Sequence, residues 1–164
     1  IMTAAHCVVD CPDSFDSLKL CSINKAGLTH VTIGTADPRT VTNYNISQVV
    51  AHPDYYMEDV PVNDIALIKL ETPLVYSAKI QPIKIYTGTI KDNDSSRVIG
   101  WGKTQENQKS ANPAPYEVDL ALSNDREACD LIDGLDFKDS NGPYICSAKN
   151  DFKGTCQGDS GGPL

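Results

Sequence analysis

The sequence contains no apolar run that could cross a membrane, since a spanning helix needs about 20 consecutive apolar residues. It also lacks a basic excess: 14 Lys and Arg residues stand against 22 Asp and Glu residues, a formal charge of −8 at pH 7. A nucleic-acid-binding surface needs the opposite sign of charge. We therefore expect neither a membrane nor a nucleic acid among the partners. We do not expect the N-terminal segment IMTAAHCVVD to be a signal peptide, because it has no basic start and no long apolar stretch.

The cysteines never occur as CxxC, which is the commonest spacing of zinc ligands. They are Cys7, Cys11, Cys21, Cys129, Cys146 and Cys156. Dispersed cysteines favour disulfides and an oxidising compartment, and reduced core cysteines are the alternative. Two N-x-S sequons, at Asn45 and Asn93, are compatible with a secretory route. Because no close pair of His and Cys ligands exists, we expect no metal and no cofactor.

Short apolar runs alternate with clusters of turn residues along the chain. Strands are predicted over Val31–Gly34, Ile46–His52, Asp64–Leu70, Arg97–Gly102 and Glu117–Ser123. This spacing predicts an all-β barrel or sandwich. The run DIALIKL is apolar on nearly both faces, which predicts a central, buried strand. One helix is predicted over residues 123–132, and a division into two halves over residues 78–95, where the strand pattern fades.

Three short segments carry the residue types that nucleophilic acyl transfer requires. They are TAAHC at residues 3–7, NDIAL at 63–67 and GDSGGPL at 158–164. A serine hydroxyl needs a neighbouring base to accept its proton, and an imidazole titrates in the right range. A carboxylate on the other ring nitrogen fixes the tautomer of that imidazole. Glycines around the serine permit a tight turn in which backbone N–H groups can converge on an oxyanion.

These segments, in this order, resemble those of the trypsin/chymotrypsin family of serine endopeptidases. The resemblance implies an all-β, chymotrypsin-like fold of two six-stranded antiparallel Greek-key barrels, with one short helix in the second half. We expect residues 1–164 to be a partial peptidase domain. Residues 1–85 would form the first barrel without its N-terminal strands, and residues 86–164 the second without its C-terminal strands and helix. Because open barrels expose unpaired strand edges, we expect a chain of residues 1–164 alone to be inactive.

The resemblance assigns a role to each matching residue. His6 matches the general base, Asp64 the orienting carboxylate and Ser160 the nucleophile. Gly158 and Ser160 match the oxyanion-hole positions. Asp159 matches the carboxylate that pairs with a new N-terminal ammonium after zymogen cleavage.

The specificity pocket implied by the resemblance includes Gly154, Thr155 and Gln157. Gly154 lies six residues before Ser160, at the position where an Asp confers a preference for Arg and Lys. A neutral residue there removes the counter-charge for a cationic side chain. We therefore expect chymotrypsin-like or elastase-like specificity.

The resemblance also implies disulfides. Cys129 and Cys146 match a pair, whereas Cys7 and Cys156 match cysteines whose partners lie outside this chain. Cys11 and Cys21 lie in an insertion after His6, and whether they pair with each other stays open.

The predicted function is that of a secreted, extracellular serine endopeptidase. Its expected partners are protein or peptide substrates and protein protease inhibitors, and we expect a monomer. The main alternative is a non-catalytic protease homologue that binds or regulates partners, although such homologues usually lose His, Asp or Ser. A disulfide-stapled structural module without activity is a further alternative.

Overall fold

The computed structural model describes residues 1–12, 17–23, 27–37, 42–57, 60–123, 144–147 and 153–164. The chain forms two compact units, Ile1–Lys84 and Ile85–Leu164. The boundary between them falls within residues 78–95, where the strand pattern of the sequence fades. Each unit is built on an antiparallel sheet with its own buried side chains.

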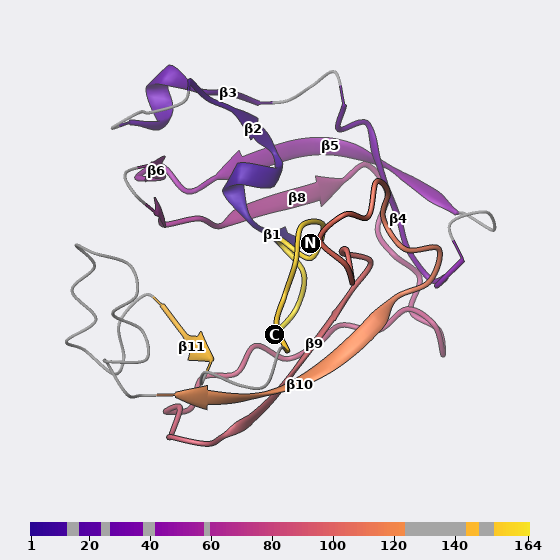
Figure 1. The fold of residues 1–164 in the computed structure, drawn as a ribbon. Coiled ribbons are helices and arrows are strands. Elements are labelled where there is room, and N and C mark those ends of the chain that lie inside the picture. Colours follow the sequence, from indigo (N-terminus) through magenta and orange to yellow (C-terminus); the bar gives the residue numbers. More distant parts are fainter. Residues whose placement is uncertain (13–16, 24–26, 38–41, 58–59, 124–143, 148–152) are drawn as a thin grey trace. The chain divides into compact units, whose positions relative to one another are not determined.

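The first unit contains a four-stranded sheet in the order β1-β8-β5-β4 and two short hairpins, β2–β3 and β6–β7 (Figure 1). Its strands are β1 (Met2–Thr3), β2 (Val9–Asp10), β3 (Ser22–Ile23), β4 (His30–Thr32), β5 (Asn43–Ala51), β6 (Tyr56–Met57), β7 (Pro61–Val62) and β8 (Ala66–Leu70). Two 3₁₀ turns, η1 (Ala5–Cys7) and η2 (Leu18–Leu20), interrupt them. The central pair β5–β8 carries a bulge between Ile46 and Gln48.

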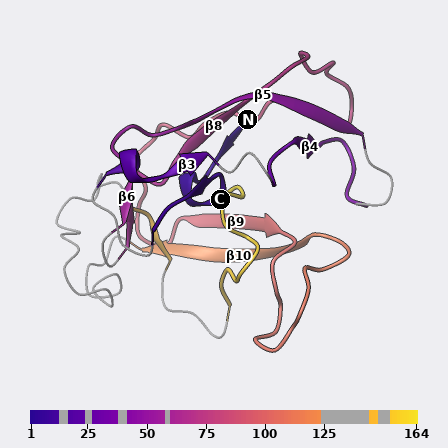
Figure 2. The ribbon, with the colours of Figure 1, turned by 90° about the horizontal axis from the view of Figure 1, so that it is seen from above.

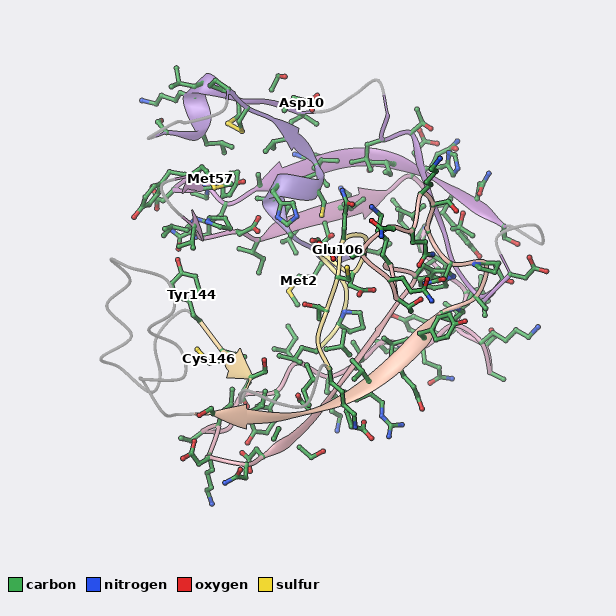
Figure 3. All side chains as sticks on the ribbon, in the orientation of Figure 1. Met2, Asp10, Met57, Glu106, Tyr144 and Cys146 are labelled. Atoms are coloured by element: carbon green, nitrogen blue, oxygen red, sulfur yellow. A yellow bond between two sulfur atoms is a disulfide. The ribbon has the colours of Figure 1, made fainter. Side chains whose placement is uncertain are left out.

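One face of the β5–β8 sheet packs on the core of the first unit. Ala66 and Ile68 of β8 are buried, whereas the alternate residue Leu67 is 56% exposed. On one side, Leu67 pairs with Met2 of β1, which is labelled in Figure 3. On the other side, Leu67 pairs with Val50 of β5. This alternation is typical of an antiparallel strand with one packed face. The sequence correctly predicts β8 as a central strand, but the prediction of a buried strand holds for one face only.

A disulfide closes the hairpin that follows His6. Val9 pairs with Ile23 and Asp10 with Ser22, and the next facing pair in this register, Cys11 and Cys21, is joined by the disulfide. A two-residue ladder has little stability of its own, so the covalent bond supports it. Both cysteines also pack against the core of the first unit.

The second unit is built on a three-stranded sheet in the order β11-β10-β9. Figure 2 shows its β9–β10 pair. Its strands are β9 (Ser95–Gly100), β10 (Tyr116–Ser123) and β11 (Cys146–Ser147). Its buried apolar side chains in the described part of the chain are Val98, Leu120 and Leu122. On the exposed face of the β9–β10 pair, the Arg97 guanidinium donates two hydrogen bonds to Asp119, at 2.6 and 3.0 Å.

The all-β prediction is confirmed, and each predicted strand overlaps an observed one. The bounds shift by up to three residues, because β5 starts at Asn43 and β8 starts at Ala66. The helix predicted over residues 123–132 falls almost entirely on residues 124–143, outside the described part of the chain. No helix among the described residues is long and apolar enough to span a membrane.

Candidate active site

The TAAHC segment presents an imidazole on the surface of the first unit. Ala4 and Ala5 are buried, and their small side chains let the 3₁₀ turn η1 lie against the core. Val8 follows at 1% exposure and fixes the other end of the turn. His6 lies between these anchors, with 39% of its side chain exposed. Buried residues on both sides therefore position an imidazole that solvent can reach.

Asp64 holds His6 through both carboxylate oxygens. The backbone N–H of His6 donates to Oδ1 at 2.8 Å, and Nδ1 of the imidazole lies 2.6 Å from Oδ2. The Asp64 side chain is only 18% exposed, so little water competes for these bonds. A carboxylate on Nδ1 favours the tautomer that carries its proton there and leaves Nε2 as the basic nitrogen.

Two further groups lie in the electrostatic field of Asp64. Burial raises the pKa of the Tyr55 hydroxyl, and the negative charges of Asp64 and of a Cys7 thiolate raise it further. Burial also raises the pKa of the Cys7 thiol, again with a contribution from Asp64. Both groups are therefore uncharged at neutral pH. The Cys7 sulfur lies 3.5 Å from Nε2 of His6, a weak contact because a thiol is a weak hydrogen-bonding group.

The GDSGGPL segment forms two consecutive turns that share Asp159. Its N–H donates to the carbonyl of Cys156 at 3.0 Å, and its own carbonyl accepts from the N–H of Gly162 at 3.0 Å. The third residue of each turn is a glycine with positive φ, Gly158 at 101° and Gly161 at 76°. Such turns favour glycine there because a side chain would be strained. Ser160 is the second residue of the second turn and is exposed.

The Asp159 carboxylate fastens this double turn to the segment after β9. Oδ1 accepts from the N–H of Gly102 at 2.8 Å, and Oδ2 accepts from the N–H of Cys156 at 3.0 Å. A Cβ atom at Gly100 or Gly102 would collide with this carboxylate. The GWG sequence therefore supplies the space as well as one of the two donors for Asp159.

A cavity of about 440 Å³ in the second unit reaches two of the predicted pocket residues. Gly154 and Thr155 line it, together with the apolar side chains of Val98 and Val118 and the ring of Tyr116. Gln157 does not line this cavity; it is exposed, and its carbonyl accepts from the N–H of Lys103 at 2.9 Å.

The structure thus groups the predicted site residues by unit. His6 and Asp64 are in direct contact, and Gly158, Asp159 and Ser160 lie on one double turn. Cys7 and Cys156 take part in no disulfide within the described residues. Cys146 of β11, labelled in Figure 3, is disulfide-bonded, and its predicted partner, residue 129, lies outside the described part of the chain.

Three neighbours of these residues are not identified by the sequence analysis. Gly102 receives the Asp159 carboxylate, Tyr55 is buried near Asp64, and Asn63 shapes the turn that carries Asp64. They lie in the segments GWG at residues 100–102, HPDYY at 52–56 and NDIAL at 63–67, but their contacts leave no local sequence pattern. Among the described residues, no group of three or more His, Cys, Asp or Glu side chains is arranged to hold a metal ion.

Comparison with known proteins places the whole chain in one family. The Trypsin family model matches residues 1–164. The chain is 33% identical over 168 residues to the venom peptide isomerase heavy chain of Agelenopsis aperta, covering all of this chain and 65% of that protein. It is 31% identical over 173 residues to a venom serine protease of Polistes dominula, covering all of this chain and 56% of that protein. The chain thus spans less than two thirds of the length of these relatives.

The fold agrees with these matches. The structure of mouse brain neuropsin, a serine protease, superposes with a TM-score of 0.73 at 21% identity, over 99% of this chain and 66% of that one. The all-β fold is therefore chymotrypsin-like, and the sequence relatives include serine proteases. The chain belongs to the trypsin family of serine proteases.

Proposed function

We propose that this chain carries the catalytic residues of a serine endopeptidase that hydrolyses peptide bonds through an acyl-enzyme. The observation that carries the proposal is the double hydrogen bond between Asp64 and His6, with Nδ1 only 2.6 Å from the carboxylate. In the proposed site, Nε2 of His6 is the base for the hydroxyl of Ser160. The Cys7 thiol contact to Nε2 would end if Cys7 pairs with a cysteine outside the chain.

In the proposed reaction, Ser160 Oγ attacks the carbonyl carbon of the substrate while Nε2 of His6 takes the hydroxyl proton. The tetrahedral intermediate collapses, the C–N bond breaks, and His6 returns the proton to the leaving amine. Water then attacks the acyl-enzyme in the same way and releases the acid, which restores Ser160. Asp64 remains ionised throughout and stabilises the imidazolium.

We propose that the N–H groups of Gly158 and Ser160 bind the oxyanion. The N–H of Gly158 donates no hydrogen bond to any described residue, and Gly158 is exposed. Losing one such donor typically costs about 3 to 4 kcal/mol of barrier lowering. Asp159 would fix both turns, and its carboxylate keeps acceptor capacity for the ammonium of an activated N-terminus beyond its two backbone bonds.

The proposed specificity is chymotrypsin-like or elastase-like. Gly154 has no side chain to pair with a cationic substrate group, and nothing lies within 4 Å of the position that a Cβ would take there. An apolar or aromatic side chain before the cleaved bond needs no counter-charge. The test is a set of peptide substrates that differ at this position: Phe, Leu or Ala substrates should have a higher kcat/KM than Arg or Lys substrates.

The proposed setting is extracellular, with protein substrates and protein protease inhibitors as partners of a monomer. The disulfide between Cys11 and Cys21 supports an oxidising compartment. The two relatives described as venom proteins support the same setting.

Labelling with a fluorophosphonate tests the catalytic proposal against the binding-homologue alternative. The complete, activated protein should be labelled at Ser160, and the S160A variant should not be labelled. The H6A variant should be labelled far more slowly, because the base is absent. A folded protein that is not labelled would favour the non-catalytic homologue instead.

A further inference from the structure

The turn that carries Asp64 depends on an unusual backbone conformation at the preceding residue. Among the described non-glycine residues, only Asn63 and Asn93 have positive φ, at 53° and 63°. Asparagine tolerates this left-handed region better than most residues. The N–H of Ile65 donates to the carbonyl of Asn63 at 2.8 Å, which closes a three-residue turn with Asp64 at its centre.

The side chain of Asn63 ties this turn to the opposite side of the loop. Its Nδ2 donates to the carbonyl of Asp54 at 2.9 Å. The acceptor is well fixed, because the next residue, Tyr55, is only 1% exposed and its N–H donates to the carbonyl of His52 at 3.0 Å. Asn63 therefore connects the Asp64 turn to a segment that is anchored in the core.

Few contacts other than those with His6 hold the Asp64 side chain in place. Within the described part of the chain, its side chain makes hydrogen bonds only to His6, through the backbone N–H and the imidazole. Where the carboxylate lies is therefore set by its backbone, and hence by the turn before it. A small displacement of that turn would lengthen the 2.6 Å contact to His6.

The chemistry of this position suits asparagine better than its nearest substitutes. Glycine accepts positive φ but has no side-chain donor. Aspartate has the same shape, but its ionised carboxylate can only accept, and it would face the Asp54 carbonyl. Alanine loses the donor and is strained at positive φ.

We propose that Asn63 is a positioning residue, which holds the Asp64 carboxylate in register with the His6 imidazole through its left-handed backbone and its tether to Asp54. This role adds a positioning residue to the proposed function. The expected effect of Asn63 on kcat rests on that proposed function.

The test compares N63G with N93G in the complete, activated protein. Both variants replace a left-handed asparagine by glycine, but Asn93 lies in an exposed turn and its side chain makes no hydrogen bond within the described residues. We expect N63G to lower kcat about tenfold, the equivalent of one lost hydrogen bond, with KM changed less than about twofold. N93G should match the wild type. N63A should lose more than N63G, because it adds strain.

A second readout separates positioning from folding and from turnover. The proton of His6 between Nδ1 and Asp64 should give a far-downfield ¹H NMR resonance, which should move upfield in N63G and stay in place in N93G. An unchanged resonance in N63G would overturn the proposal, and so would a loss of kcat no larger than the loss of folded protein. If the wild type is not labelled by a fluorophosphonate, the proposed function fails, yet the resonance still decides the role of Asn63.

Discussion

The two units hold their site residues by different means. In the first unit, eight apolar side chains of the described residues are buried, and His6 follows two of them directly along the chain. In the second unit the described residues bury only three, Val98, Leu120 and Leu122. There Ser160 is carried by two glycine turns, which one carboxylate fastens to backbone N–H groups.

The difference shows that the residues of the proposed catalytic site are held by two kinds of rigidity. Apolar burial fixes His6, and the free-energy cost of losing that burial scales with the volume removed. Turn geometry and polar contacts fix the segment of Ser160, which depends on the space left empty at Gly100 and Gly102. Removing atoms should therefore damage the first unit most, and adding atoms should damage the second.

The largest expected effect is that of Tyr55→Ala in the first unit. Tyr55 is 1% exposed, and deleting a buried aromatic side chain typically costs about 3 to 5 kcal/mol of the free energy of unfolding. Tyr116→Ala in the second unit is the control, because Tyr116 is 57% exposed and its loss should cost about 0.5 kcal/mol or less. Urea unfolding measures both variants. Equal losses would contradict the contrast between the units.

Removing the Cys11–Cys21 disulfide should have the next largest effect. The bond spans a sequence separation of ten residues, for which the loop-closure model gives about 3 kcal/mol. The double variant C11A/C21A should unfold at lower urea concentration and should be cleaved faster between residues 10 and 23 in limited proteolysis. Ser22→Ala, an exposed neighbour on β3, is the control and should behave as the wild type. Unchanged stability would mean that the core alone holds the hairpin.

Adding one methyl group at Gly102 should damage the second unit. Gly102→Ala places a Cβ against the Asp159 carboxylate, and overpacking of this kind costs about 1 to 3 kcal/mol. Because Asp159 must then move, labelling of Ser160 by a fluorophosphonate should also slow. Gly154→Ala is the matched control for the free energy of unfolding, since its Cβ meets nothing within 4 Å. A labelling rate in Gly102→Ala equal to that of the wild type would show that Asp159 does not fix the turn.

The smallest expected effect comes from the surface ion pair on β9 and β10. The hydrogen bond from Arg97 lowers the pKa of the Asp119 carboxyl, and the charge of Arg97 lowers it further. The unfolded chain therefore takes up this proton at higher pH than the folded one. The stabilisation is present above the ordinary carboxyl range and is lost as the pH falls through the lowered pKa.

Comparing the pH dependence of unfolding between the wild type and D119N checks the direction of this effect. The difference in unfolding midpoint should be largest near neutral pH and should shrink in acid. It should also shrink in about 1 M NaCl, because both side chains are more than half exposed and salt screens such pairs. A difference in unfolding midpoint that grows in acid would contradict a lowered pKa for the Asp119 carboxyl.

The sequence predicts the structure best where the signal lies in neighbouring residues. The apolar run in residues 46–52 and the alternation in residues 117–123 identify β5 and β10, and the GDSGGPL letters identify a turn that only glycine permits. Strand ends were harder to predict. β5 begins at Asn43, before its apolar run, because Thr32 and His30 of β4 pair with Asn43 and Asn45. Polar residues in such pairs give no hydrophobic signal.

The hydrogen bonds from Asn63 to Asp54 and from Gly102 to Asp159 could not be predicted, because each joins a side chain to a backbone group elsewhere in the chain. The strand predicted from Asp64 starts two residues later, since the Asn63 turn intervenes. The strand predicted to run to Gly102 ends at Gly100, where the chain instead makes room for Asp159. The strands of two residues, such as β6 and β7, are too short to show any periodicity.

The Cys11–Cys21 bridge has a consequence for covalent integrity. A single peptide-bond cleavage anywhere between these two cysteines would leave both halves joined through sulfur. On a non-reducing gel the nicked molecule would migrate as one species, and only a reductant would release the N-terminal piece that carries His6. Cleaved molecules would thus accumulate without a change on a non-reducing gel, while the His6 imidazole stays attached to the rest of the protein.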